Sequence, residues 1–219
     1  RPGLVWSDGV PLKASDFVFG FRLMLDPKTA AQYASIQYAV KNAEAVNSGK
    51  LPVDQVGVHA PDDTTVVIEL EAPTPFLAGL LTHYTAFPIP EHVSKKFGAA
   101  WIKPGNMVSN GAYTLAHWKA HEEVKIVKNP LFYDAANVAI DEVYYYPTDD
   151  QTAALSRFRA GELDANIGTR GFPISQYAWL QENMPGQAHI FPMLGSEYIA
   201  LNTRRPPFTD QRLRQAVSL

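Results

Sequence analysis

The chain has 219 residues, of which 46% are hydrophobic and 19% are charged, so it can bury one large core or two small ones. A net charge of -3 argues against nucleic acid and anionic membranes as partners, and no apolar run approaches the roughly 20 residues that span a bilayer. The absence of cysteine excludes disulfides, thiolate catalysis and cysteine-ligated metal.

Residues 4–27 combine a turn, a helix start and a helix stop. Ser7, Asp8 and Gly9 have the chemistry of a turn. Ser15 is predicted to cap the helix that follows, with Asp16 favouring its positive end. The Asp26-Pro27 pair predicts that this helix stops there.

The next segment predicts a helix and a strand pair. Residues 37–48 are expected to be helical and to end at Gly49. Asp62 and Asp63 predict a turn between strands over 56–60 and 65–71, the second of which alternates apolar and polar residues.

Prolines organise the following part of the chain. Pro75 is expected at the first position of a short helix that ends near Thr82. Residues 87–90 contain two prolines, predict extended backbone and are the best internal boundary. A helix over 92–97, closed by Gly98, should follow.

Three strands are predicted next, over residues 110–118, 123–128 and 139–146, and they should share a sheet. The alternation of strands with helices indicates an α/β fold in which helices cover mixed sheets.

The C-terminal part predicts two helices and then two strand-like runs. Thr148 and Gln151 have the spacing of a capping box for a helix that ends at Gly161. A second helix is expected over 175–183, and the strand-like runs are 188–193 and 196–202.

Catalytic motifs are missing from the sequence. The six histidines never form a close metal-ligand pair, and no nucleophile elbow or phosphate loop occurs. Asp149 and Asp150 resemble a carboxylate pair, but the first turn of a helix already explains them. The chain is therefore predicted not to be an enzyme. A hydrolase that uses Asp149, Asp150 or a histidine remains the alternative from another class.

Residues 4–27 resemble the opening motif of the peptide and oligopeptide substrate-binding proteins of bacterial ABC importers. Further segments resemble the same family in the same order, which makes the resemblance specific. These segments are residues 26–38, 56–83, 87–98, 109–118, 128–134, 157–165 and 198–219.

The resemblance implies a class II periplasmic-binding-protein-like α/β fold with incomplete lobes. Residues 1–90 would belong to the small lobe, 91–195 to the main lobe, and 196–219 to a crossing strand and the start of a third lobe. Members of the family are more than twice as long as this chain. Because the chain begins at Arg1 without a signal peptide, it is expected to be an internal fragment.

The implied function is that of a periplasmic receptor. A monomeric protein without cofactor or metal would close on an extended peptide and deliver it to an inner-membrane ABC permease. Dipeptides, murein peptides, haem and nickel complexes are the alternative ligands that the resemblance implies.

Tyrosine suits such a cleft because its ring gives broad apolar contact and its hydroxyl adds one hydrogen bond. The resemblance places ligand-binding residues at the YAS segment, at the end of the LLTH helix, after the GELDA run and in the strand before the PPF motif. They are Tyr33, Ser35, His83, Ile167, Gly168, Thr169, Arg170, Tyr198 and Asn202. Arg170 departs from the family pattern, and it would either bind a carboxylate with two hydrogen bonds or remain a solvated loop charge.

Overall fold

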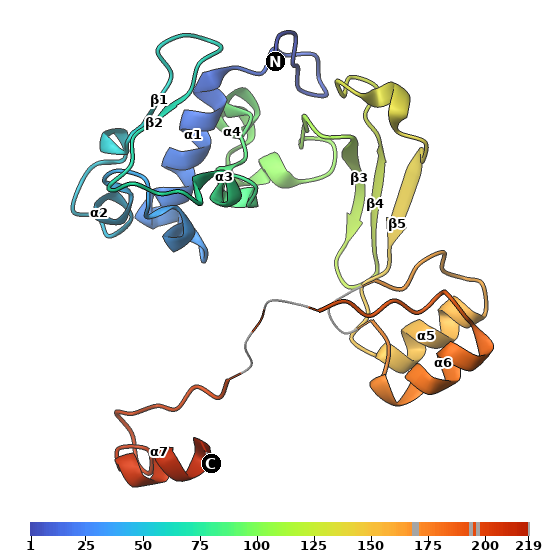
Figure 1. The fold of residues 1–219 in the computed structure, drawn as a ribbon. Coiled ribbons are helices and arrows are strands. Elements are labelled where there is room, and N and C mark those ends of the chain that lie inside the picture. The colour runs from blue at the N-terminus through green and yellow to red at the C-terminus, as the bar shows by residue number, and fades with distance from the viewer. Residues whose placement is uncertain (168–170, 193–194, 196–197, 219) are drawn as a thin grey trace. The chain divides into compact units, whose positions relative to one another are not determined.

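The structure is a computed structural model that describes residues 1–167, 171–192, 195 and 198–218 (Figure 1). Helices and strands alternate along these residues, and none of the helices has the length and hydropathy that a bilayer crossing requires. The helices are α1 Ala14–Leu25, α2 Ala43–Asn47, α3 Leu77–Leu80, α4 Glu91–Phe97, α5 Gln151–Arg159, α6 Tyr177–Asn183 and α7 Gln211–Ser218. The strands are β1 Val58–His59, β2 Val67–Ile68, β3 Tyr113–Lys119, β4 Glu123–Lys128 and β5 Glu142–Tyr145.

The chain folds as two compact units, Arg1–Thr148 and Asp149–Leu219. Residues 87–90, the boundary expected from the sequence, lie inside the first unit. The division of the whole protein into three lobes stays a prediction.

Asp16 organises the start of α1, so the prediction that Ser15 caps this helix is wrong. The helix begins at Ala14, and the Lys13 N–H donates to Asp16 Oδ2 over 2.9 Å. Trp6 Nε1 donates to the same oxygen over 3.1 Å. Because the helix begins one residue before Ser15, Ser15 lies inside its first turn and Lys13 occupies the N-cap position. The predicted stop is confirmed, since Asp26 is the C-terminal cap residue of α1.

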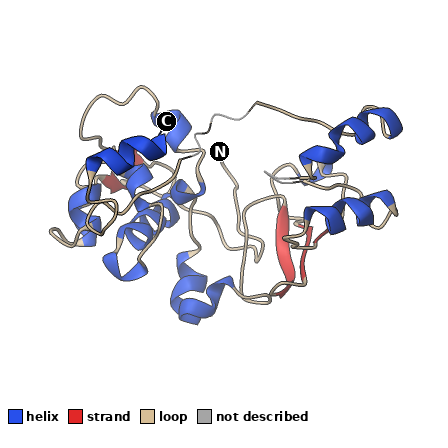
Figure 2. Cartoon of the chain, turned by 90° about the horizontal axis from the view of Figure 1, so that it is seen from below, coloured by secondary structure: helices blue, strands red, loops and turns tan. Residues whose placement is uncertain are grey.

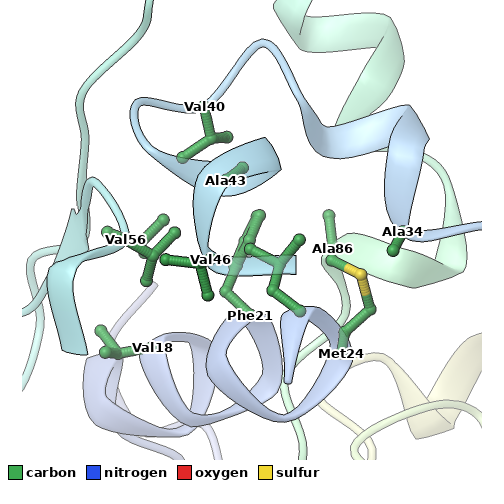
Figure 3. Packing of buried hydrophobic residues seen from close by; sticks show 11 residues of the cluster. Val18, Phe21, Met24, Ala34, Val40, Ala43, Val46, Val56 and Ala86 are labelled. Carbon is green, nitrogen blue, oxygen red and sulfur yellow. The ribbon is translucent and has the colours of Figure 1, made fainter. Parts of the chain in front are cut away.

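The core of the first unit lies between α1 and the segments that follow it. In Figure 3, Phe21 and Met24 point from α1 toward the layer that holds Val46 and Ala86. Phe21 is only 2% exposed. The buried apolar residues of this core are Val18, Phe21, Met24, Leu25, Ala34, Val40, Ala43, Val46, Val56, Val58 and Ala86.

The predicted helix over 37–48 is wrong in its first half. Residues Ala34–Gln37 form a 3-10 helix, Val40 pairs with Leu70 as an isolated β-bridge, and α2 begins only after Asn42, whose φ is 62°. A left-handed residue cannot continue an α-helix, so the bridge to Leu70 overrides the local helical preference. The predicted stop at Gly49 is confirmed by its φ of 74°.

The two strands on either side of Asp62 pair as predicted, although they are short. Val58 pairs with Ile68 and His59 with Val67 in an antiparallel, two-stranded sheet. Asp62 Oδ1 accepts the Thr64 N–H over 2.8 Å, which confirms the predicted turn.

Residues 87–90 run past α1 and lead into α4. The extended backbone before this helix was predicted from the two prolines, and Phe87 and Pro90 confirm it. The Ile89 N–H donates to the Asp16 carbonyl over 3.2 Å, and Pro90 precedes the first residue of α4. A Cβ added at Gly20 would lie 2.8 Å from the Phe87 carbonyl oxygen. Glycine in the middle of α1 therefore permits this close approach, at a helix-propensity cost of roughly 1 kcal/mol.

The three strands predicted over 110–146 form one antiparallel sheet in the order β3-β4-β5 (Figure 1). Figure 2 draws strands in red. They form no pair with β1 or β2 among the described residues. Lys125 on β4 lies 2.9 Å from Glu142 on β5, and its ammonium stacks over the Tyr144 ring. The Tyr144 hydroxyl and the Glu142 carboxylate raise the pKa of Lys125 to about 12. Tyr144 itself is 43% exposed.

The second unit corrects two further predictions. The cap of α5 is Asp150 and not Thr148, because Asp150 Oδ1 accepts the N–H groups of Thr152 and Ala153 over 2.8 and 3.1 Å. The structure assigns no strand to the described residues of 188–193 and 196–202, where the sequence predicted two. A strand requires a partner backbone, and the sequence pattern alone does not show whether one is present.

We expect Asp150→Ala to destabilise α5 by about 1 kcal/mol, because it leaves two N-terminal N–H groups without their acceptor. Thermal unfolding followed by circular dichroism measures this loss. Asp149→Ala removes the same charge without removing the cap, and an equal loss in both variants would show that charge, not capping, is responsible.

Asp8 and His92 join the opening turn to α4, with 2.8 Å between Asp8 Oδ2 and His92 Nε2. Burial alone would raise the pKa of Asp8, but hydrogen bonds from His92 and from the Val10 N–H lower it below the usual value of 3.8. A lowered carboxyl pKa stabilises the fold above its unfolded-state value, and this stability is lost as the pH falls through the folded-state pKa.

We therefore expect Asp8 to contribute to the fall in the free energy of unfolding between pH 5 and pH 3. Because the pair is exposed, this contribution should be on the order of 0.5 kcal/mol, and Asp8→Asn should abolish it. Urea unfolding at both pH values measures it. The same acid-induced loss in wild type and Asp8→Asn would contradict a role for this carboxyl.

Candidate functional site

Three aromatic side chains, Tyr33, His83 and Tyr84, meet on the first unit and are called the aromatic cluster below. The His83 ring lies 5.8 Å from Tyr33, edge to face, and 4.1 Å from Tyr84 in a tilted stack. Tyr33 and Tyr84 meet edge to face at 6.2 Å. These centroid distances lie in the range in which aromatic pairs attract one another.

Two short 3-10 helices position the aromatic cluster. Tyr33 directly precedes Ala34–Gln37, and His83 directly precedes Tyr84–Ala86. Ala34 and Ala86 are both part of the buried core. The aromatic rings are therefore attached to backbone that the core holds in place.

The aromatic cluster remains accessible. Tyr33 is 52% exposed and Tyr84 is 59% exposed, although both carry large apolar rings. Large exposed aromatic surface that is held rigidly from below is typical of a binding surface.

Buried polar groups support His83 from behind. His83 Nδ1 lies 3.0 Å from Thr85 Oγ1, and Gln37 Nε2 donates to the same hydroxyl over 2.9 Å. Gln37 and Thr85 are both buried. The orientation of the His83 ring is therefore fixed by hydrogen bonds inside the unit.

The second unit holds an open depression of about 890 Å³, whose lining residues Ile167 and Phe191 are 77% and 78% exposed. Its lining joins the loop after α5 to the α6 region and to residues near 190. Lining residues include Phe158, Asp164, Asn166, Ile167, Phe172 and Phe191. Ile167, one of the predicted binding residues, therefore borders this depression. Gly168, Thr169 and Arg170 lie outside the described residues.

The other predicted residues lie apart from these features within their own units. Ser35 is exposed in the 3-10 helix that follows Tyr33. Tyr198 is 83% exposed. Asn202 Oδ1 accepts the Arg204 N–H over 3.1 Å, so this side chain stabilises a local turn.

The structure thus brings together Tyr33 and His83, which are separated by fifty positions in the sequence. Tyr84 was missed, although it follows His83 directly and its ring makes the shortest contact in the aromatic cluster. A tyrosine adjacent to a predicted binding histidine was the available signal. Binding roles for the nine predicted residues stay a prediction.

Among the described residues, no three His, Cys, Asp or Glu side chains gather around a common point. The aromatic cluster offers stacking surface and hydrogen bonds, which suits the binding of an organic ligand.

Comparison with known proteins finds similar proteins over the whole length of this chain. The family model described as bacterial extracellular solute-binding proteins, family 5 (Middle), matches residues 1–219. The probable deoxycholate-binding periplasmic protein YgiS of Escherichia coli strain K12 is 41% identical and matches over 100% of this chain and 41% of its own length. The periplasmic oligopeptide-binding protein OppA of the same organism is 37% identical, over 100% of this chain and 40% of its own.

A solved structure confirms the fold. The crystal structure of Haemophilus influenzae OppA in complex with RPPGFSPFR superposes with a TM-score of 0.92 at 35% identity, covering 99% of this chain and 42% of that one. The predicted class II periplasmic-binding-protein-like α/β fold is therefore confirmed. The chain spans about two fifths of the length of these relatives.

Proposed function

Because the chain belongs to the family 5 bacterial extracellular solute-binding proteins, we propose that it is part of a receptor that captures oligopeptides and delivers them to an ABC-transporter permease. The observation that carries this proposal is the exposed aromatic cluster, on a chain that matches the family over its whole length. Periplasmic relatives support an extracytoplasmic location. A monomer is sufficient for this role.

The chemistry of the aromatic cluster suits peptides. Tyrosine rings can contact apolar side chains of many shapes. Their hydroxyls can form hydrogen bonds with the peptide backbone, which is the same in every peptide sequence. A receptor for peptides of varied sequence needs this combination. Tyr33 and Tyr84 supply the aromatic surface, and His83 between them supplies a polar ring.

Isothermal titration calorimetry tests the proposal on the protein at its full encoded length. We expect a mixed library of tripeptides to pentapeptides to bind with a micromolar or lower Kd. Absence of heat at millimolar peptide would overturn the assignment of peptides as ligands.

A bile acid is the second candidate ligand, and one observation favours it. The 41% identical relative is named as a probable deoxycholate-binding protein. Deoxycholate combines a rigid apolar body with a carboxylate, so an aromatic surface with a polar ring also suits it. Deoxycholate titrated into the same protein below its micelle concentration would separate the candidates, since binding of deoxycholate without peptide binding would favour the bile acid.

The proposed receptor has no catalytic activity. The relatives named above are binding proteins, and Asp150 is engaged in capping α5. We expect peptidase, esterase and phosphatase substrates to show no turnover that depends on His83 or Asp149. Turnover that His83→Ala or Asp149→Asn abolishes would support the hydrolase alternative instead.

A further inference from the structure

We propose that Gln37 and Thr85 hold His83 in the neutral tautomer that carries its proton on Nε2. In this form the aromatic cluster presents an N–H donor to a carbonyl or carboxylate oxygen of the ligand. The ligand half of this inference rests on the proposed function, whereas the tautomer depends only on contacts within the first unit.

The argument starts at the Gln37 amide, which is fully buried. Its Nε2 lies 3.4 Å from the Leu80 carbonyl oxygen and 2.9 Å from Thr85 Oγ1. A carbonyl oxygen only accepts hydrogen bonds, so the amide must turn its NH2 group toward Leu80. The opposite orientation would place two acceptors against each other.

This orientation decides the role of the Thr85 hydroxyl. Its oxygen accepts a hydrogen bond from Gln37 Nε2, and its single hydrogen is then free for another partner. The nearest such partner is His83 Nδ1, 3.0 Å away. The Thr85 hydroxyl therefore has a hydrogen that it can donate to Nδ1, and the other contact of Nδ1 decides between this direction and the reverse.

A second donor converges on the same ring nitrogen. The backbone N–H of Thr85 lies 3.4 Å from His83 Nδ1, where the ring caps the 3-10 helix Tyr84–Ala86. A nitrogen that accepts from two donors carries no proton, so the proton of the neutral imidazole must be on Nε2.

Nε2 is left available for a ligand. It has no hydrogen-bond partner among the described residues, and it is not among their buried unpaired atoms. The donor lies on a ring stacked at 4.1 Å on Tyr84 and 5.8 Å from Tyr33. Peptide carbonyls and terminal carboxylates are acceptors that this geometry suits.

The hydrogen bonds that run from Gln37 through Thr85 to His83 are called the relay below. The free-energy cost of burying the Gln37 amide argues that the relay does more than fill the core. Gln37 Oε1 is buried and has no hydrogen-bond partner among the described residues. An unpaired buried acceptor destabilises a fold, so the polar residue at position 37 needs a reason other than stability. An apolar residue at position 37 would avoid this cost but would lose the orientation of Thr85.

Ring nitrogen-15 spectra of the full-length protein at mildly alkaline pH test the tautomer without any ligand. Protonated and unprotonated imidazole nitrogens resonate in separate regions, and the loss of signals in His83→Gln assigns the ring. We expect the Nε2–H tautomer in wild type and in Thr85→Ser, which keeps the hydroxyl. Thr85→Val keeps the shape but not the hydroxyl, and there we expect a mixture of tautomers.

Titration of the mixed tripeptide to pentapeptide library completes the test. We expect peptide to shift the Nε2 signal of the wild-type protein. We expect the Thr85→Val variant to bind peptide roughly threefold to tenfold more weakly than wild type, which is the loss expected for one hydrogen bond. Thr85→Ser should bind like wild type. Gln37→Leu, which removes the first donor of the relay, should reproduce the Thr85→Val spectrum.

Each contrary outcome identifies the step that fails. An Nδ1–H tautomer in wild type, or unchanged spectra in both Thr85→Val and Gln37→Leu, overturns the relay. Saturation with peptide that leaves the Nε2 signal unmoved overturns donation to the ligand. If wild type binds no peptide at all, the proposed function fails together with the ligand half, while the tautomer spectra still decide the relay.

Discussion

Replacing Phe21 with alanine should lower the free energy of unfolding by about 3 to 5 kcal/mol. Phe21 is 2% exposed and contributes the largest side chain to the buried cluster between α1 and its neighbours. Truncation removes the transfer energy of the ring and leaves a cavity that the close-packed surroundings fill only in part. A loss of this size is a large fraction of the stability of a typical domain.

Urea unfolding of the full-length protein, followed by a signal from the first unit, measures this loss. Phe76→Ala is the matched control because Phe76 lies in the same unit but is 62% exposed, so its loss should stay below about 1 kcal/mol. Equal losses in the two variants would show that the core is not centred on α1. Phe21→Leu should fall between wild type and alanine, since it leaves a smaller cavity.

The parts of the fold that follow from local chemistry could be predicted. The stop of α1 at Asp26, the turn at Asp62 and the extended backbone of 87–90 each rest on residues within a few positions of one another. The three strands of the β3-β4-β5 sheet were likewise found from alternation and turn residues.

The failed predictions have two kinds of cause, one long-range and one local. The helix over 37–48 lost its first half to the bridge between Val40 and Leu70, which no window around Val40 contains. The two wrong caps have a more local cause. The first helix begins one residue before Ser15, which puts Ser15 inside the helix. At α5, Asp150 Oδ1 accepts two N–H groups and takes the place of the capping box that the sequence favoured.

The candidate site could likewise be predicted only in part from the sequence. Resemblance to a family pointed to Tyr33 and His83, but their edge-to-face contact depends on two 3-10 helices held against one core. The relay from Gln37 through Thr85 could not be predicted, because a buried glutamine in an apolar stretch carries no pattern of its own. Side-chain hydrogen bonds between distant segments become visible only when the fold is known.

Tyr33→Ala should weaken peptide binding by the full-length protein roughly tenfold to a hundredfold, equivalent to about 1 to 3 kcal/mol. The substitution removes a half-exposed ring that also contacts His83 and Tyr84. A ligand therefore loses its contact with Tyr33. The rings of His83 and Tyr84 also lose their edge-to-face contacts with Tyr33, which help to hold them in place. Stability should change little, because about half of the Tyr33 surface is already exposed.

Calorimetry with the tripeptide to pentapeptide library measures the change, and two variants separate its causes. Tyr33→Phe keeps the ring and loses only the hydroxyl, so it should weaken binding by less than tenfold if apolar contact dominates. Tyr133→Ala removes a tyrosine of similar exposure, 59% against 52%, that lies outside the aromatic cluster, and it should leave affinity unchanged. Wild-type affinity in Tyr33→Ala would exclude the aromatic cluster from the ligand site. A large loss in Tyr33→Phe would instead assign the main interaction to the hydroxyl, because the apolar surface of the ring is the same in both proteins.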